Sequence, residues 1–358
     1  MKVVISGYYG FDNVGDEAIL LSIISALRQK NEGIEITVLS NNPAVTQKTY
    51  GVKAVNRWKI PQVMKAIKHS DGLISGGGSL LQDSTSLKTI PYYTGIMMIA
   101  QLLKKPVFVY AQGMGPINNS FNRWLTKFAL KRTTITVRDE ASKQLLREIG
   151  LKQPIQVVPD PVMGLVSPLE SNEWLDQLNL AHPILAVSVR DWPTTTAFKK
   201  YIAKCLDKFI TQYEVSVVFI PMHGKHDAES SQSVINLMEN SAYLSPYQQS
   251  IEEKITLIGQ ADMLLGMRLH ALIFAATEIT PFVALSYDPK IDAFSEIVQQ
   301  KVAAHVDASN WNEQTLFEQL EALLLNHNER KMQLSECANQ LKQQAIATAE
   351  MAINRLQK

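Results

Sequence analysis

The sequence predicts an α/β protein with two Rossmann-like, doubly wound domains that face a cleft, followed by a helical C-terminal tail. Three observations support this prediction. Short apolar runs alternate with amphipathic runs, which indicates mainly parallel sheets with helices between the strands. The alternation is interrupted once, between Asp160 and Pro183, where prolines are frequent. At 358 residues, the chain also suits two medium-sized domains better than one core.

The first domain is predicted over residues 1–165, and it begins with the β-branched strand Lys2–Ser6, which is followed by glycine. The later short apolar runs are predicted as buried strands, and the amphipathic runs between them are predicted as helices. The further predicted strands are 34–40, 72–75, 107–112, 134–138 and 155–159. The predicted helices are 16–30, 61–69, 88–104, 121–132 and 141–148.

The alternation restarts after a proline-rich junction, in which one short helix is predicted near residues 173–178. The second domain is predicted over residues 183–312. Its predicted strands are 184–189, 215–220, 263–266 and 282–286, and its predicted helices are 198–213, 228–240, 251–254 and 271–276. Residues 313–358 are poor in proline and are predicted as C-terminal helices.

Composition restricts the possible functions. The formal net charge is +1, so the chain has no global field that would attract nucleic acid. Cys205 and Cys337 lie far apart, in no metal or redox spacing, which fits a reducing compartment. The N-terminus reaches Gly7 and Asp12 too early for a signal peptide, and the strongest apolar run, 95–103, is too short to span a bilayer. A cytoplasmic protein is therefore expected.

The most informative run joins a predicted strand, ending at Gly266, to a predicted helix through Met267, Arg268, Leu269 and His270. Side chains two residues apart do not face each other on a helix, so Arg268 and His270 converge only if the turn holds them. Such turns, at the carboxyl ends of strands, are where open α/β sheets bind ligands. A fixed cation beside an imidazole indicates an anionic substrate that needs proton transfer. Local capping by Arg268 and packing of His270 explain the same run.

Further candidate cations follow other predicted strands. Arg138 and Arg190 each stand in a Val-Arg-Asp run at a strand end, one in each domain, and Lys290 lies just beyond the strand 282–286. Guanidinium groups suit phosphate and carboxylate groups through paired hydrogen bonds. Chance alone also explains a repeated three-residue run such as Val-Arg-Asp. A single lysine such as Lys290 is usually a solvated surface residue.

The loops of the first domain favour an uncharged, polyhydroxyl ligand. Asn13 and Asp16 stand at the start of a helix, where the acidic residues would repel a phosphate. Gly77, Gly78 and Gln112 lie in two glycine-rich runs that follow strands, where backbone amides can approach a ligand closely. Helix capping explains Asp16, and tight turns explain either glycine run taken alone.

Two other segments have alternative interpretations. The run 221–227 contains His223, His226 and Asp227, but the spacing matches no strong zinc pattern, so we expect no metal and assign His223 to the lining of the cleft. The predicted helix 121–132 has basic residues on one stripe and aromatic residues mostly on other faces, which would suit an anionic membrane surface. Packing of its apolar side on the sheet explains most of that pattern.

Taken together, these segments resemble the polysaccharide pyruvyl transferase family, and most closely its bacterial CsaB-type enzymes of cell-wall polymer synthesis. The resemblance lies in residues 7–17, 76–83, 112–116, 137–142, 189–192, 221–227 and 266–270, which follow the family's order. It implies a GT-B-like fold and transfer of pyruvate from phosphoenolpyruvate to a sugar as a 4,6-ketal. The implied acceptor is N-acetylmannosamine of a lipid-linked saccharide, with possible peripheral contact at the inner face of the cell membrane.

This resemblance also implies roles for particular residues. Phosphoenolpyruvate is a co-substrate, and no other cofactor is expected. His270 and Arg138 are the expected catalytic residues, and the expected donor-binding residues are Arg138, Arg268, Leu269, His270 and Lys290. The expected acceptor-binding residues are Asn13, Asp16, Gly77, Gly78, Gln112, Arg190 and His223. His270 either protonates the donor or deprotonates the acceptor. Two alternatives stay open: a sugar-nucleotide glycosyltransferase of the same architecture, and a non-catalytic glycan-binding protein.

Overall fold

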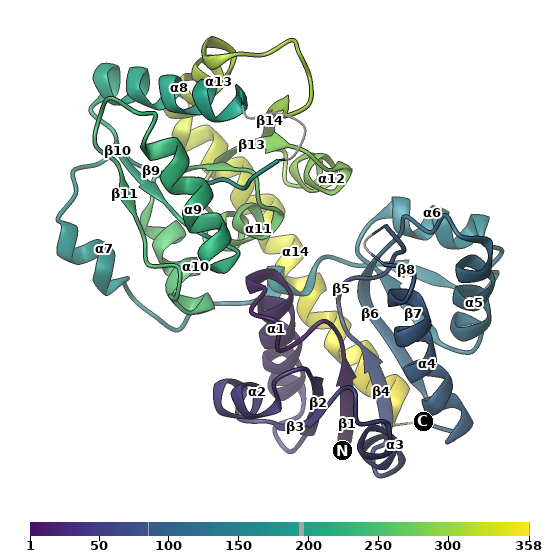
Figure 1. Ribbon diagram of the computed structural model, residues 1–358. Helices are drawn as coiled ribbons and strands as arrows, with labels where there is room; N and C mark the ends of the chain where they lie inside the picture. Colours follow the sequence, from purple (N-terminus) through teal and green to yellow (C-terminus); the bar gives the residue numbers. More distant parts are fainter. Residues whose placement is uncertain (85, 193–196, 358) are drawn as a thin grey trace. The chain divides into compact units, whose positions relative to one another are not determined.

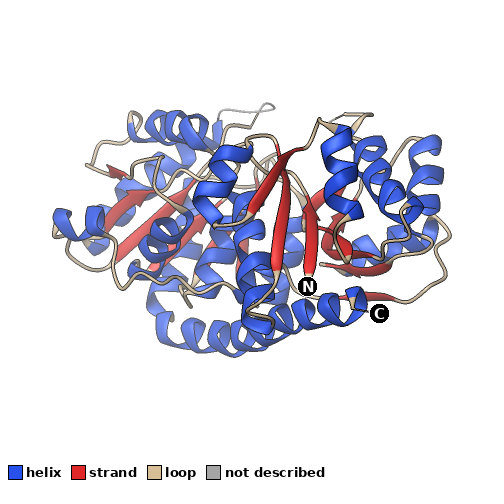
Figure 2. Ribbon diagram, turned by 90° about the horizontal axis from the view of Figure 1, so that it is seen from below, coloured by secondary structure: helices blue, strands red, loops and turns tan. Residues whose placement is uncertain are grey.

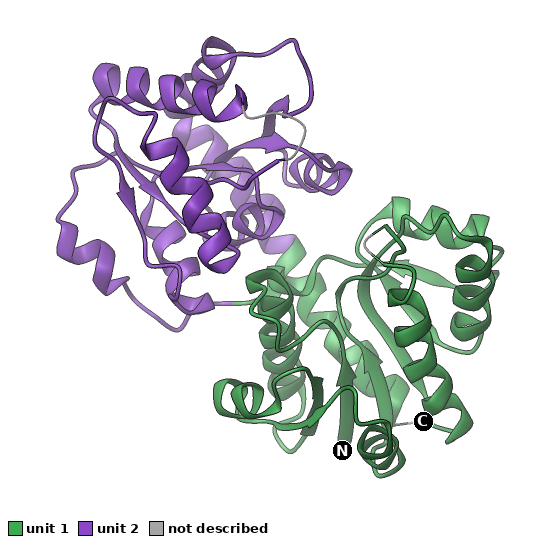
Figure 3. Ribbon diagram, viewed as in Figure 1, with its two compact units in different colours: residues 1–165, 341–358 green, residues 166–340 purple. Residues whose placement is uncertain are grey.

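The computed structural model describes residues 1–84, 86–192 and 197–357 (Figure 1). They form two compact units (Figure 3). Unit 1 comprises Met1–Leu165 together with Leu341–Lys358, and unit 2 comprises Val166–Gln340. In each unit, helices pack around the strands of one sheet (Figure 2).

Unit 1 contains a parallel sheet with the strand order β3-β2-β1-β4-β6-β7-β8, and β5 pairs with β6 outside this path. The strands are β1 (Lys2–Ser6), β2 (Glu35–Ser40), β3 (Lys53–Asn56), β4 (Gly72–Ser75), β5 (Gly78–Leu81), β6 (Val107–Met114), β7 (Thr134–Val137) and β8 (Ile155–Val157). The helices are α1 (Val14–Lys30), α2 (Pro43–Tyr50), α3 (Ile60–Lys68), α4 (Thr89–Leu102), α5 (Ser120–Leu130), α6 (Glu140–Glu148) and the short 3-10 helix η1 (Pro161–Gly164).

Unit 2 contains a second parallel sheet with the order β11-β10-β9-β12-β13-β14. The strands are β9 (Ile184–Ser188), β10 (Ser216–Phe219), β11 (Tyr243–Leu244), β12 (Met263–Gly266), β13 (Phe282–Ser286) and β14 (Lys301–His305). The helices are α7 (Glu173–Leu178), α8 (Ala197–Tyr213), α9 (Gly224–Ile235), α10 (Ile251–Gln260), α11 (Leu269–Thr277), α12 (Pro289–Ile297) and α13 (Glu313–Leu325). The last helix, α14 (His327–Leu356), begins in unit 2 and ends in unit 1.

Each unit has its own hydrophobic core. In unit 1, apolar side chains of α3, α4, α5 and α6 pack on β4, β6 and β7. In unit 2, side chains of α8 and α13 pack on β9, β10, β12 and β13. The central strands of both sheets are covered on both faces, which explains why they read in the sequence as continuous apolar runs rather than as alternating ones.

Several elements were not predicted from the sequence. Helix α2 buries only Thr46 and Tyr50, so its apolar periodicity is weak. Strand β14 lies at the edge of its sheet and leaves every residue at least partly exposed, and β3 is also an edge strand. Helix α10 is longer than the predicted 251–254 because a capping box between Ser250 and Glu253 starts a helix that reaches Gln260.

Two further predictions differ from the structure. The residues predicted as a separate C-terminal tail, 313–358, are divided between the units, because α13 packs in the core of unit 2 and the end of α14 belongs to unit 1. The predicted glycine loops at 76–83 and 112–116 are partly strand, since β5 pairs with the end of β6 through Gly78 and Gln112. Within the described ranges, no helix combines the length and apolar character needed to cross a bilayer.

Candidate active site

One edge of the unit 2 sheet gathers six of the predicted site residues. Arg190 follows β9, and His223 follows β10. Arg268, Leu269 and His270 follow β12, and Lys290 follows β13. The four strands are neighbours in the order β10-β9-β12-β13 and all run in parallel. Their carboxyl ends therefore meet at the same edge, where open α/β sheets bind ligands.

Arg268 forms the best-defined contact at this edge. It is the N-cap residue of α11, and its Nε donates to Oδ2 of Asp227 over 2.9 Å, while its Nη2 donates to Oδ1 of the same carboxylate. The Asp227 side chain is completely buried, and the backbone amide of Met222 also donates to its Oδ2 over 3.3 Å. The Arg268 side chain keeps 18% exposure. Asp227 thus fixes the plane of the guanidinium and balances part of its charge.

His270 lies in the first turn of α11 and is partly buried. The backbone amides of Ala271 and Leu272 donate to the carbonyl of Arg268 over 3.0 and 3.2 Å, which starts the helix there. Arg268 itself has extended backbone angles, with φ −84° and ψ 124°, whereas His270 is helical. The strand-to-helix turn predicted from the sequence therefore lies between β12 and α11, with Arg268 before the helix and His270 in its first turn.

His223 and Arg190 belong to this same group. Partial removal from solvent and the nearby positive charge of Arg268 lower the pKa of the His223 imidazole from its usual 6.5, and Arg190 has the same effect. The Arg190 guanidinium lies 4.6 Å from the ring centroid of Tyr287 and 5.4 Å from that of Trp192. Both residues, expected from the sequence to bind the acceptor, belong to unit 2, as their place in the predicted second domain implied.

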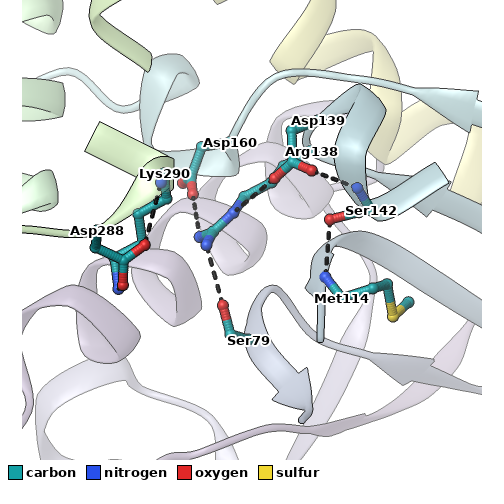
Figure 4. A network of polar contacts seen from close by, with 8 residues as sticks. All are labelled: Ser79, Met114, Arg138, Asp139, Ser142, Asp160, Asp288 and Lys290. Carbon is teal, nitrogen blue, oxygen red and sulfur yellow. Dashed lines mark hydrogen bonds and ion pairs between the residues drawn. The ribbon is translucent and has the colours of Figure 1, made fainter. Parts of the chain in front are cut away.

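Lys290 stands in the first turn of α12 and is about one-third exposed. Its Nζ lies 3.1 Å from Oδ2 of Asp288, and the backbone amide of Lys290 donates to Oδ1 of the same residue over 3.1 Å (Figure 4). A pair of this exposure is weak, so the ammonium can turn toward another anion at little cost.

Arg138 belongs to unit 1, whereas the other donor candidates belong to unit 2. Its side chain is only 9% exposed. Nη2 donates to Oγ of Ser79 over 3.0 Å, and the guanidinium lies 3.4 Å from the Asp160 carboxylate and 3.7 Å from that of Asp139 (Figure 4). Gly113 leaves the space for it, because a Cβ there would meet Nη2 at 2.8 Å.

The first-domain candidates have structural partners. Asn13 caps α1 by accepting from the amide of Gly15 over 3.1 Å. A Cβ on Gly77 would lie 2.8 Å from Ile19, and one on Gly78 would lie 2.8 Å from Oδ1 of Asp16. The two glycines therefore allow the backbone to pack on α1. This packing accounts for the glycines without a ligand.

Gln112 is completely buried. Its Nε2 donates to Oγ of Ser75 and to the carbonyl of Gly76, each over 2.7 Å. The side chain therefore links β6 to the end of β4 and to the start of the glycine run. In this arrangement Gln112 shapes the loop and does not present its amide at the surface.

Sequence reasoning missed the environment of Arg57, which is almost fully buried. Its Nη1 donates to the carbonyl of Gly7 over 2.9 Å, and its guanidinium lies 4.3 to 5.4 Å from the rings of Phe11, Trp58, Tyr92 and Tyr93. Arg57 thus anchors the loop after β1. The sequence shows neighbouring aromatic residues in these segments, but it does not show that they surround Arg57. Three segments that are distant in the sequence come together there.

Two buried charges in unit 2 were also missed. The sequence suggests Asp227 only as a candidate metal ligand, whereas in the structure it is the partner of Arg268. Lys254 of α10 is completely buried and donates to the carbonyl of Tyr247 over 3.2 Å. Burial lowers the pKa of its ammonium from 10.5 to about 8. No cluster of three or more His, Cys, Asp or Glu residues suited to a metal ion occurs in the described part of the chain.

The geometry can be compared with known proteins. A sequence model of the polysaccharide pyruvyl transferase family matches residues 13–289. The amylovoran biosynthesis protein AmsJ of Erwinia amylovora is 20% identical over 407 residues, which cover 95% of this chain and 96% of that protein.

Solved structures with the same fold are similar over nearly their whole length. Anabaena HepE in complex with UDP-glucose has a TM-score of 0.66 at 13% identity, over 100% of this chain and 99% of that chain. The UDP-GlcNAc 2-epimerase of Neisseria meningitidis has a TM-score of 0.64 at 16% identity, over 99% and 100% of the two chains. The ADP-heptose heptosyltransferase II of Escherichia coli has a TM-score of 0.52 at 15% identity, over 92% and 100%. The GT-B-like α/β fold predicted from the sequence is confirmed.

Proposed function

The chain belongs to the polysaccharide pyruvyl transferase family, and from this we propose that it transfers pyruvate from phosphoenolpyruvate to a sugar as a 4,6-ketal and releases phosphate. The observation that supports this most directly is the family match over residues 13–289. The similarity to a protein of amylovoran biosynthesis supports a transferase of polysaccharide biosynthesis.

We assign the donor to the strand-end edge of unit 2. Phosphoenolpyruvate carries a phosphate and a carboxylate, and Arg268 and Lys290 are cations at the ends of adjacent strands. Asp227 holds the Arg268 guanidinium in one plane, which favours a directional contact with an oxyanion. Leu269 and His270 form the first turn of α11, where the helix dipole also favours negative charge.

The reaction requires the transfer of one proton to the methylene carbon and the formation of two bonds from sugar hydroxyls to the central carbon. A proton is added to the methylene carbon, and a sugar hydroxyl forms a bond to the central carbon. The bond from that carbon to the phosphate oxygen then breaks, phosphate leaves with the electron pair, and the second hydroxyl closes the ketal. Of the two protons lost by the hydroxyls, one balances the proton gained by carbon and the other leaves with phosphate. We assign the proton transfer at carbon or at the hydroxyl to His270, with Arg138 as a second catalytic cation.

We assign the acceptor to N-acetylmannosamine of a lipid-linked saccharide, as for a CsaB-type enzyme in the cytoplasm, working at the inner face of the membrane. In unit 1, Asn13 and Asp16 at the start of α1 offer hydrogen-bonding groups for hydroxyls. Gln112 holds the glycine run that follows β4, and Gly77 and Gly78 allow that run to pack on α1. In unit 2, Arg190 and His223 stand beside the donor residues and are assigned to the sugar that approaches them.

The test is mass spectrometry of a synthetic lipid-linked disaccharide incubated with the enzyme and phosphoenolpyruvate. The expected product is heavier by one pyruvate less one water, and phosphate is released only when the acceptor is present. In deuterated water, the new methyl group should carry a single deuterium from the solvent. The variant Arg268→Gln should lose the product, whereas Lys225→Gln, a matched change of an exposed lysine in the same unit, should retain it. Unmodified acceptor under all conditions would refute the proposal.

The alternatives predict different ligands. A sugar-nucleotide glycosyltransferase is worth testing because HepE, which has the same fold, was solved with UDP-glucose. Thermal-shift titrations compare phosphoenolpyruvate with UDP-sugars. Stabilisation by the nucleotide alone would favour a glycosyltransferase. A glycan-binding protein would bind the acceptor equally well after Arg268→Gln.

A further inference from the structure

Helix α5 exposes three large aromatic side chains on one face. Phe121, Trp124 and Phe128 are 60%, 57% and 54% exposed. They are three and four residues apart and so form one stripe, in which neighbouring rings stack with centroids 5.8 and 5.7 Å apart. The opposite side of α5, with Leu125, packs in the core, so core packing does not account for the exposed stripe. A contiguous exposed apolar surface of this kind marks an interaction site.

The neighbouring helix extends this surface. Figure 1 shows α4 beside α5, and Nε2 of Gln101 at the end of α4 donates to the carbonyl of Ala129 near the end of α5 over 2.7 Å. Leu102, the next residue, is 79% exposed. Helix α4 contains no charged residue. We call the exposed side chains of Leu102, Phe121, Trp124 and Phe128 the aromatic face.

The segment that carries the aromatic face has charged residues of one sign only. Between Asp83 and Asp139 the sequence contains eight Lys and Arg residues and neither Asp nor Glu. This leaves 27 of the 35 basic residues for the rest of the chain, which holds all 34 acidic residues. The charges of a chain with a net charge of only +1 are therefore unevenly distributed along the sequence, and the segment that contains α4 and α5 is strongly positive.

Four cations of this segment are exposed on or next to the two helices that carry the rings. Lys104 follows the exposed end of α4, and Lys127, Lys131 and Arg132 lie on or just after α5, all exposed. The bounding carboxylates are already engaged: Asp83 accepts from the backbone amides of Asn118 and Asn119, and Asp139 caps α6. They do not neutralise the exposed lysines.

From this combination we infer that the aromatic face of α4 and α5 docks on an anionic lipid surface. Aromatic rings favour the interface of a bilayer, and exposed cations beside them attract anionic headgroups. A second copy of this chain fits the face poorly, because pairing it with itself would bring two sets of cations together. This docking is a property of the protein alone and does not depend on the proposed transfer reaction, although it would bring the enzyme to a lipid-linked acceptor.

The test is co-sedimentation of the full chain with vesicles of phosphatidylcholine, with and without phosphatidylglycerol. The wild type should bind the anionic vesicles and bind them more weakly as salt is raised. The triple change Phe121→Ser, Trp124→Ser and Phe128→Ser should weaken binding roughly tenfold or more. The matched control changes three exposed apolar residues of unit 2, Leu237→Ser, Leu325→Ser and Met332→Ser, and should bind as the wild type does.

A charge variant and a spectroscopic signal complete the test. Changing Lys127, Lys131 and Arg132 to Gln should cost about fivefold in affinity per residue, or on the order of a hundredfold together. Subtracting the emission spectrum of Trp124→Phe from that of the wild type gives the emission of Trp124. The maximum of this emission should shift to the blue when anionic vesicles are added. Equal binding by the aromatic variant and the wild type, or no binding to anionic vesicles at low salt, would overturn the inference. Self-association that the aromatic variant abolishes, without vesicle binding, would assign the face to a protein partner instead.

Discussion

The guanidinium of Arg268 is held at two points by a carboxylate, Asp227, that is completely shielded from solvent. The two residues come from different strand ends, since Asp227 lies in α9 and Arg268 stands before α11. A buried charge persists only when it is paired and hydrogen-bonded, so each residue requires the other. The Arg268 side chain keeps 18% exposure, so the pair is not completely shielded from solvent on the arginine side.

Asp227→Asn should lower the free energy of unfolding by roughly 3 kcal/mol, because it leaves Arg268 without its counterion. Urea denaturation measures this loss. The matched control is Asp288→Asn, which removes the partly exposed pair with Lys290 but keeps a side chain that can cap α12. That change should cost less than about 1 kcal/mol. Equal losses for the two variants would mean that the Arg268 pair contributes no more than a surface pair.

His270→Gln should lower kcat for pyruvate transfer by roughly 10²–10⁴-fold, because it removes the group assigned to proton transfer. Circular dichroism and the unfolding midpoint should change little, since His270 is only partly buried. His305→Gln is the matched control, because His305 is an exposed histidine of the same unit. Normal turnover by the His270 variant would remove it from the mechanism.

Lys254 should make stability depend on pH. Burial lowers the pKa of its ammonium to about 8 in the folded protein, compared with 10.5 for an ordinary lysine. Between these two values the unfolded chain binds more protons than the folded one, so stability rises with pH from about 8 to about 10.5. The size of the rise from this group is on the order of 3 kcal/mol.

The variant Lys254→Met isolates this contribution. Denaturation at pH 7 and at pH 10.5 gives the difference between variant and wild type at each pH. The variant should gain stability relative to the wild type at pH 7 and lose that advantage at pH 10.5. A difference that is independent of pH would show that Lys254 stays charged in the folded protein.

Gly76→Ala should destabilise unit 1, because the new Cβ would lie 2.0 Å from Oη of the buried Tyr9. The expected loss is roughly 1–3 kcal/mol. Adding Tyr9→Phe should restore part of it, since Tyr9 Oη has no hydrogen-bond partner among the described residues. Gly95→Ala in α4 is the control: apart from its chain neighbours and the backbone of its own helix, no described atom lies within 4 Å of its Cβ position. Because alanine favours a helix, stability should rise by up to about 1 kcal/mol. Thermal melts compare all three variants.

Much of the fold followed from local patterns. The strands β1, β4, β12 and β13 were predicted within a residue of their observed bounds, because each is a short apolar run that a glycine or polar residue ends. Elements with little burial, such as α2 and β14, were missed because their sequences lack a clear apolar period. Hydrophobic periodicity reports which face of an element is buried, so an element with little burial leaves no clear period in the sequence.

The sequence by itself determined the alternation of strands and helices, the position of Arg268 and His270 in a strand-to-helix turn, and the family resemblance. Only the tertiary structure decided the partners: Asp227 for Arg268, the aromatic rings around Arg57, and α1 for Gly77 and Gly78. It also grouped Arg190 and His223 with Arg268. The reason is physical. A period along the chain records which face of an element is buried. The role of a charged residue or of a glycine depends instead on the atoms that pack against it, and these come from segments distant in the sequence.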